Sequence, residues 1–127
     1  MTRLLLALMV LTTASQASQG TNVAGDWELV QTAFNDDNGG QRTAGCAVRQ
    51  DGRRLAGKCG NDQLAGDVND ERGVAWQLIV NYDNHTATIF YQGNLDESGT
   101  IIRGTWRCPK HCENAAYKKG EFVASKR

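Results

Sequence analysis

The chain has 127 residues, and its 14 lysine and arginine residues balance 14 aspartate and glutamate residues. The length suits one domain with a single hydrophobic core. A formal net charge of zero argues against nucleic acid and against an anionic membrane as partners, because both require a basic face.

Residues 1–17 have the three-part pattern of a secretory signal peptide. Arg3 supplies the positive start, Leu4 to Leu11 form an apolar run, and Ser15-Gln16-Ala17 fits a small-x-small cleavage site. The apolar run is too short to span a bilayer. The sequence therefore predicts a cleaved signal peptide over 1–17 and one domain over 18–127, in a secreted or periplasmic protein.

Eight strand signals separated by turn signals follow, and no helical period is found after the signal peptide. The expected strands lie near residues 23–32, 44–50, 54–60, 63–68, 74–82, 87–95, 101–108 and 117–125. Short links make consecutive strands antiparallel neighbours. The longest link, near 33–44, is polar and glycine-rich, and it is a candidate mobile loop at a barrel mouth.

These signals predict an all-β fold, an eight-stranded antiparallel up-and-down (meander) barrel. A two-sheet sandwich is the alternative, and regular hairpins without a long crossover favour the barrel.

A short phrase recurs along the expected strands: apolar residue, any residue, glycine, any residue, apolar residue. It occurs at residues 23–27, 55–59, 64–68, 91–95 and 102–106, with a looser copy at 118–122. The spacing places the glycine and both apolar residues on one face of a strand. Glycine is unfavourable in a strand unless the sheet bends or another backbone approaches closely, so the phrase indicates a sheet curled onto itself.

Turn positions fix the register of two hairpins. A two-residue turn at Ser98-Gly99 places Tyr91 opposite Trp106, and one at Asp83-Asn84 places Trp76 opposite Tyr91. Both hairpins agree on the inward face of the strand that they share. Three aromatic side chains then form one inward row across neighbouring strands.

This aromatic row has two interpretations. In the first, the row lines a ligand pocket, because such sites are mostly apolar and aromatic. In the second, the row fills the core, because the interiors of small barrels are filled by side chains. Together with a tryptophan on the first strand, it gives the candidate ligand-binding residues Trp27, Trp76, Tyr91 and Trp106.

An even number of cysteines in an exported chain indicates disulfides. Cys46 and Cys59 flank the hairpin that turns near Asp51-Gly52, where they lie opposite or diagonal to each other. We therefore predict a Cys46–Cys59 bridge.

The segment 108–112 reads Cys-Pro-Lys-His-Cys. A Cys108–Cys112 disulfide that pins the last loop is the favoured interpretation, and a redox pair is the alternative. A partial metal clip is disfavoured, because a structural site needs four ligands and this segment offers three. We therefore expect no metal.

Gly25-Asp26-Trp27 resembles the Gly-x-Trp opening of the calycins, the barrels that include lipocalins and avidins. Residues 48–57, Trp76, and 94–106 with its Asp-x-x-Gly turn stand in the order of avidin landmarks. The resemblance implies a small exported meander barrel that binds a small ligand.

The resemblance to avidins does not extend to their ligand site. Where avidins place polar residues for the biotin ureido oxygen, this chain has Glu28-Leu29-Val30-Gln31. Cys59 stands where an avidin-like pocket offers a tyrosine, and Trp76 is followed by Gln77-Leu78-Ile79-Val80 rather than by serines and threonines. Because a ureido group needs those hydrogen-bonding partners, biotin is not the expected ligand.

No nucleophile-elbow, phosphate-loop or metalloprotease motif is found in the sequence. We therefore expect no enzyme and no cofactor. The prediction is an exported, non-enzymatic binding module that holds a small apolar or aromatic ligand at the barrel mouth. The alternative is a protein-binding module, similar in shape to small exported protease or lysozyme inhibitors, that acts through exposed loops. A thiol–disulfide protein that uses Cys108 and Cys112 is a third hypothesis. The identity of the ligand or partner and the oligomeric state stay open.

Overall fold

The computed structural model describes residues 21–33, 41–112 and 119–127. The predicted signal peptide and residues 34–40 of the expected long loop lie outside these ranges. Among the described residues, there is no helix with the length and apolarity needed to cross a membrane.

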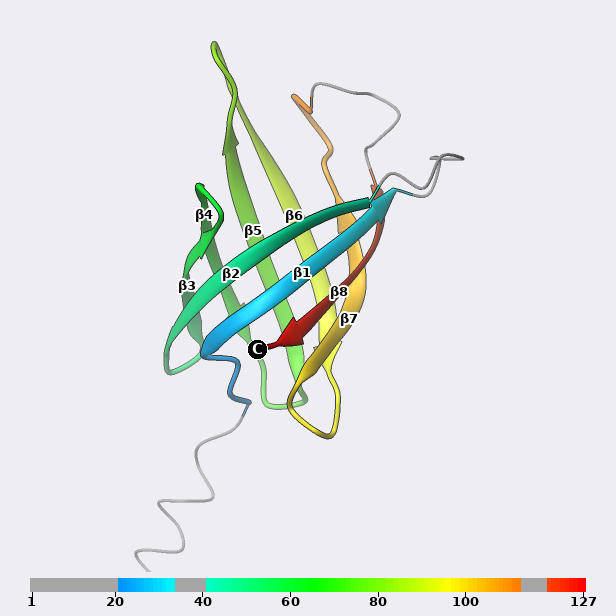
Figure 1. The fold of residues 1–127 in the computed structure, drawn as a ribbon. Helices are drawn as coiled ribbons and strands as arrows, with labels where there is room; N and C mark the ends of the chain where they lie inside the picture. Colours follow the sequence, from blue (N-terminus) through cyan, green and yellow to red (C-terminus); the bar gives the residue numbers. More distant parts are fainter. Residues whose placement is uncertain (1–20, 34–40, 113–118) are drawn as a thin grey trace, which may run out of the picture.

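Eight antiparallel strands form a closed barrel in which each strand pairs with its neighbours in sequence, and β1 pairs with β8 (Figure 1). The strands are β1 Gly25–Ala33, β2 Gln41–Asp51, β3 Arg54–Cys59, β4 Asp62–Val68, β5 Gly73–Asn81, β6 Thr86–Leu95, β7 Ile101–Arg107 and β8 Lys119–Lys126. The predicted all-β up-and-down barrel is confirmed.

One expected boundary is wrong. The long link was placed near 33–44, but β2 begins at Gln41, and its first residues pair with the end of β1 from Thr32 to Leu29. Polar residues 41–43 look like loop in the sequence, and ladder pairing with β1 overrides that local preference.

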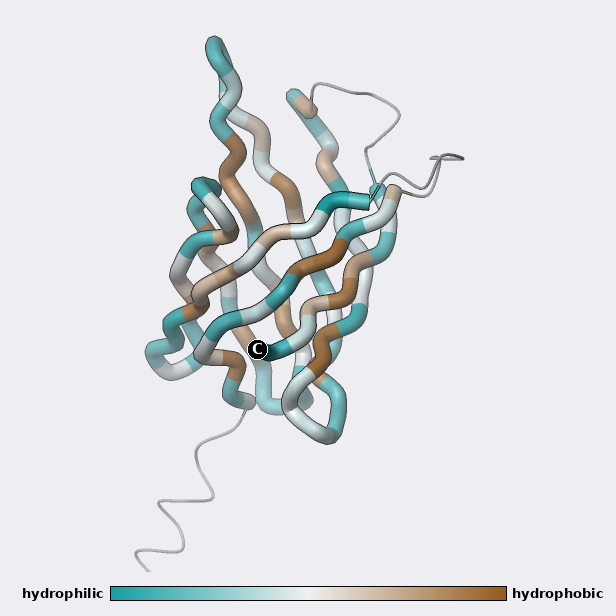
Figure 2. The backbone as a smooth tube through the Cα atoms, in the orientation of Figure 1, coloured by the Kyte–Doolittle hydropathy of each residue, from teal (hydrophilic) through white to brown (hydrophobic). Residues whose placement is uncertain are grey.

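The register of the two hairpins follows the prediction. Trp76 pairs with Tyr91, and Tyr91 pairs with Trp106. Buried and exposed residues alternate along the strands, which Figure 2 shows as alternating hydrophobic and hydrophilic segments of the tube. The inward face therefore carries the hydrophobic core, as a closed barrel requires.

Two inward-facing glycines show how tightly the sheet coils. A Cβ atom on Gly104 would lie 1.9 Å from the backbone oxygen of Gln92, and one on Gly57 would lie 1.9 Å from that of Ala47. Any side chain there would force adjacent strands apart. The close approach of neighbouring backbones explains both positions.

The two ends of the barrel differ in what closes them. In Figure 1 the upper end carries the β3–β4 and β5–β6 turns, and the lower end carries the β2–β3, β4–β5 and β6–β7 turns. Buried aliphatic side chains close the lower end: Leu55, Val68, Val74, Leu95 and Ile102. Several of the last inward positions at the upper end are short or charged, namely Ala33, Arg42, Asp62, Ala87 and Gly120, whereas the last inward position of β5 is the aliphatic Val80.

Candidate functional site

Three of the four aromatic candidates lie side by side inside the barrel. Trp76, Tyr91 and Trp106 occupy one row of β5, β6 and β7 and are 3%, 2% and 4% exposed. The Trp76 and Tyr91 ring centroids are 6.3 Å apart. Phe122 of β8, the strand next to β7, joins them with its ring centroid 6.2 Å from that of Trp76 and edge-on to Tyr91 at 5.3 Å.

Phe122 was not among the predicted site residues. Its signal was the looser glycine phrase at 118–122, which places this phenylalanine on the inward face. Its contact with Trp76 joins β8 to β5, which are not neighbours in the ladder, so counting residues between adjacent strands does not predict it.

Trp27 lies apart from this group. It is fully buried, and its indole Nε1 donates to the Val23 backbone oxygen at 2.9 Å. It pairs in register with Cys46, and no ring contact with the other three candidates is found within the described residues. Trp27 therefore packs the first strand against the segment that precedes it.

The indole nitrogens of the other two tryptophans differ. Trp106 Nε1 donates to the Thr32 backbone oxygen at 3.1 Å. Trp76 Nε1 is buried and has no acceptor among the described residues. An unpaired buried donor is unfavourable by about 1–3 kcal/mol, so Trp76 offers a hydrogen bond that the described part of the chain does not use.

The hydroxyl of Tyr91, a member of the aromatic row, points toward three polar side chains and forms with them a polar cluster that the sequence did not predict. We call Gln31, Arg42, Asp62 and Tyr91 the polar cluster. Gln31 is buried and accepts a hydrogen bond from the Tyr91 hydroxyl through its Oε1. Arg42 pairs with Gln31 across β1 and β2, so both side chains share the inward face.

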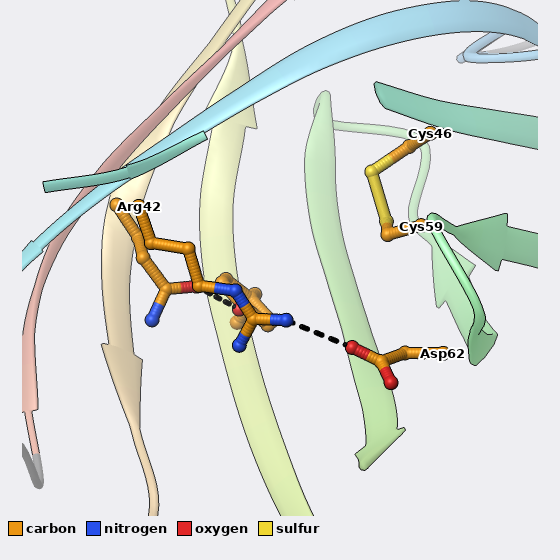
Figure 3. Close-up of a disulfide and its surroundings, with 6 residues drawn as sticks. Arg42, Cys46, Cys59 and Asp62 are labelled. Atoms are coloured by element: carbon orange, nitrogen blue, oxygen red, sulfur yellow. Dashed lines mark hydrogen bonds and ion pairs between the residues drawn. A yellow bond between two sulfur atoms is a disulfide. The ribbon is translucent and has the colours of Figure 1, made fainter. Parts of the chain in front are cut away.

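Arg42 reaches from β2 to the start of β4. Its Nη2 atom lies 3.0 Å from Asp62 Oδ2, and Figure 3 shows this contact beside the Cys46–Cys59 disulfide. The Arg42 side chain is 50% exposed and the Asp62 side chain is 15% exposed. The guanidinium is therefore held near the upper end with part of its surface accessible.

Burial raises the pKa of the Tyr91 hydroxyl well above its usual range, Arg42 lowers this pKa, and Asp62 raises it. Burial dominates because the phenolate would lose its hydration. Tyr91 therefore stays a neutral hydrogen-bond donor to Gln31.

The predicted Cys46–Cys59 bridge is confirmed. The two residues are directly opposite in the β2–β3 ladder, with a Cα–Cα distance of 3.9 Å. The bridge ties the upper part of β2 to the end of β3, close to Asp62. It therefore helps to fix the strand ends that carry the polar cluster.

The second disulfide joins Cys108 to Cys112 after β7. Cys108 is fully buried. The His85 ring packs against Tyr82, with centroids 4.8 Å apart, and its Nε2 lies 3.0 Å from the His111 backbone oxygen. The pairing agrees with the favoured interpretation that the bridge pins this loop, here against the β5–β6 turn.

Two adjoining hollows of ≈ 380 and ≈ 390 Å³ lie on the outer face of β4 to β7. Their shared walls are formed by Asp67, Ala75, Gln92 and Thr105, which alternate with inward residues on their strands. A polar outer wall of this kind is typical of the solvated face of a barrel.

No protein-family model matches this chain, and no curated protein matches it either.

Proposed function

We propose that this chain is an exported, non-enzymatic, calycin-like barrel that holds a small ligand at its upper end. The polar cluster is the observation that carries the proposal. Inward polar groups are unfavourable in a barrel interior unless they are paired or used. At the lower end, the amide of inward Gln50 accepts from Val23 N and donates to Thr21 O and Gly52 O, whereas at the upper end only one guanidinium nitrogen of Arg42 has a partner among the described residues.

The surroundings of the polar cluster favour a ligand with an apolar or aromatic body. The inward row of Trp76, Tyr91 and Trp106 lies below it, and short side chains at Ala33 and Ala87 lie around it. Ligand sites typically combine apolar walls with a few placed polar groups. Trp27 is not part of the proposed site, because its Nε1 is already bonded to the Val23 backbone oxygen.

Two further observations support an exported protein without catalytic activity. Two disulfides are typical of oxidising compartments, outside the cell or in a periplasm. Both histidines, His85 and His111, lie beside the second disulfide, and the His85 ring nitrogens contact the Asn84 side-chain oxygen and the His111 backbone oxygen. Neither arrangement resembles a nucleophile and its base.

The proposal is tested by a plug variant. Ala44 faces inward, half-buried, opposite Leu29, and Ala47 faces outward on the same strand. Chain 18–127 is screened against a small-molecule collection by tryptophan fluorescence and thermal shift. Ala44→Phe should abolish binding of any hit, and Ala47→Phe should leave it unchanged.

Two results would overturn the proposal. One is a hit that binds Ala44→Phe as tightly as the unsubstituted chain. The other is a screen without hits while native secreted or periplasmic extract yields a purified protein that binds tightly. The second result would favour the protein-binding, inhibitor-like alternative.

A further inference from the structure

We propose that the ligand of the upper end carries a planar oxyanion, such as a carboxylate, and that Arg42 binds it. This inference rests on the proposed function and assigns its ligand class. It is carried by the way in which Arg42 and Asp62 share the upper end.

Most N–H groups of the Arg42 guanidinium have no partner among residues 21–33, 41–112 and 119–127. The guanidinium presents five N–H groups in a planar fork, and among the described residues only Asp62 pairs with it, through one nitrogen at 3.0 Å. The same fork can hold a second carboxylate along another edge, with two parallel hydrogen bonds. The half-exposed side chain leaves such an edge accessible.

Asp62 acts as a positioning residue. It pairs in register with Cys59 and therefore faces inward at the start of β4. Its carboxylate holds the Arg42 guanidinium through the contact that is dashed in Figure 3. Without this contact, the long Arg42 side chain would have no described partner that holds it over the barrel interior.

The unequal exposure of the ion pair favours an anion over a cation. A cationic ligand would need Asp62, whose side chain is 15% exposed, whereas an anion needs Arg42, whose side chain is 50% exposed. The other members of the polar cluster are neutral, because burial keeps the Tyr91 hydroxyl protonated and Gln31 is an amide. An oxyanion on Arg42 therefore meets one negative group, Asp62, which is already paired.

The experiment compares acids with their uncharged counterparts. Octanoate, decanoate, benzoate and phenylacetate are each titrated beside the corresponding primary amide, with tryptophan fluorescence and backbone amide NMR as readouts. We expect the acids to bind at least about tenfold more tightly than the amides, since a charge-assisted hydrogen bond outweighs a neutral one by this margin.

Four variants separate the roles of the residues. Arg42→Gln should remove the preference for acids, and Arg42→Lys should keep part of it, because lysine is a point charge without the fork. Asp62→Asn should weaken acid binding and keep the preference. Arg49→Gln is the matched control, because Arg49 lies on the same strand, faces outward and is exposed, and it should change nothing.

The outcomes distinguish this inference from the proposed function. Equal binding of acids and amides, or an acid preference that survives Arg42→Gln, overturns the oxyanion inference and leaves the binding function intact. The inference also fails if no acid binds while other small molecules shift amide signals at the upper end. The absence of any small-molecule binding in both screens, together with tight binding of a purified protein from native extract, overturns both proposals.

Discussion

The lower and upper ends of the barrel are built from different kinds of residue. The lower end is closed by aliphatic side chains such as Leu55, Val74 and the fully buried Ile102. The upper end carries a half-exposed ion pair between Arg42 and Asp62, with short side chains around it. Apolar burial stabilises a fold by about 25 cal/mol per Å², whereas an exposed ion pair contributes about 0–1 kcal/mol. The comparison predicts that substitution of an aliphatic residue at the lower end costs more stability than substitution of the Arg42–Asp62 pair, at which we propose that a ligand binds.

Substitution of one residue at each end gives the largest expected contrast. Ile102→Ala should lower the free energy of unfolding by about 2–5 kcal/mol, because it removes packed methyl groups from a fully buried site. Arg42→Ala should lower it by about 1 kcal/mol or less. Urea unfolding followed by tryptophan fluorescence measures both values, and similar losses would contradict the division between the two ends.

The disulfides sharpen the comparison, because both of them lie in the upper half of the barrel. The Cys46–Cys59 bridge spans a sequence separation of 13 and Cys108–Cys112 a separation of 4. In the chain-entropy model, a loop of the first size contributes about 3 kcal/mol, and a shorter loop contributes less. Cys46→Ala with Cys59→Ala should therefore destabilise more than Cys108→Ala with Cys112→Ala in thermal unfolding. The reverse order would show that the loop after β7 holds the upper end together.

The two ends also differ in how much of them the sequence reveals. Once the centre of a turn is located in the sequence, counting outward from it gives the pairs of opposite residues on the two strands. The row of Trp76, Tyr91 and Trp106 was predictable in this way. Arg42 and Asp62 were missed because they stand at strand starts, where polar neighbours hide the alternation of inward and outward residues.

The Tyr91–Gln31 hydrogen bond was missed for a different reason. The two residues lie on β6 and β1, which are not neighbours in the ladder, and their contact spans the barrel interior. Counting residues outward from a turn predicts pairs on neighbouring strands. It does not predict which side chains meet across the interior of a closed barrel. The strands and turns of the barrel follow from patterns within short stretches of sequence. The contacts inside the barrel join residues that are far apart in the sequence.

A pair of tryptophan substitutions tests whether the interior holds an acceptor that the described residues do not provide. Trp106→Phe and Trp76→Phe shrink the ring equally, but only Trp106 loses a described hydrogen bond, to the Thr32 oxygen. Trp106→Phe should therefore destabilise more, by about 1–2 kcal/mol. Equal losses in urea unfolding would mean that Trp76 Nε1 also has a partner in solution, such as a bound water or ligand.

The smallest expected effect concerns Tyr91, which lies between the two ends. Tyr91→Phe should lower the free energy of unfolding at neutral pH by about 1 kcal/mol, because it removes the hydrogen bond to Gln31. The same substitution should change the response to alkali. The unfolded phenol loses its proton near its ordinary pKa of 10.0, whereas burial holds the pKa of the folded phenol higher. The neutral phenol therefore contributes stability that is fully present below pH 10 and is lost as the pH rises past this value.

The slope of that loss is about 1.4 kcal/mol per pH unit for one proton. Urea unfolding of the unsubstituted chain on both sides of pH 10 should show this decrease in the free energy of unfolding. Tyr91→Phe should lack the part of the decrease that is due to Tyr91. Gln31→Met is the matched control, because it removes the acceptor but leaves the phenol buried, and burial is the largest cause of the raised pKa. If Gln31→Met flattened the alkaline decline as much as Tyr91→Phe, the hydrogen bond rather than burial would control the protonation of Tyr91. The hydrogen bonds of the polar cluster, rather than burial alone, would then set the protonation state of Tyr91 beside Arg42.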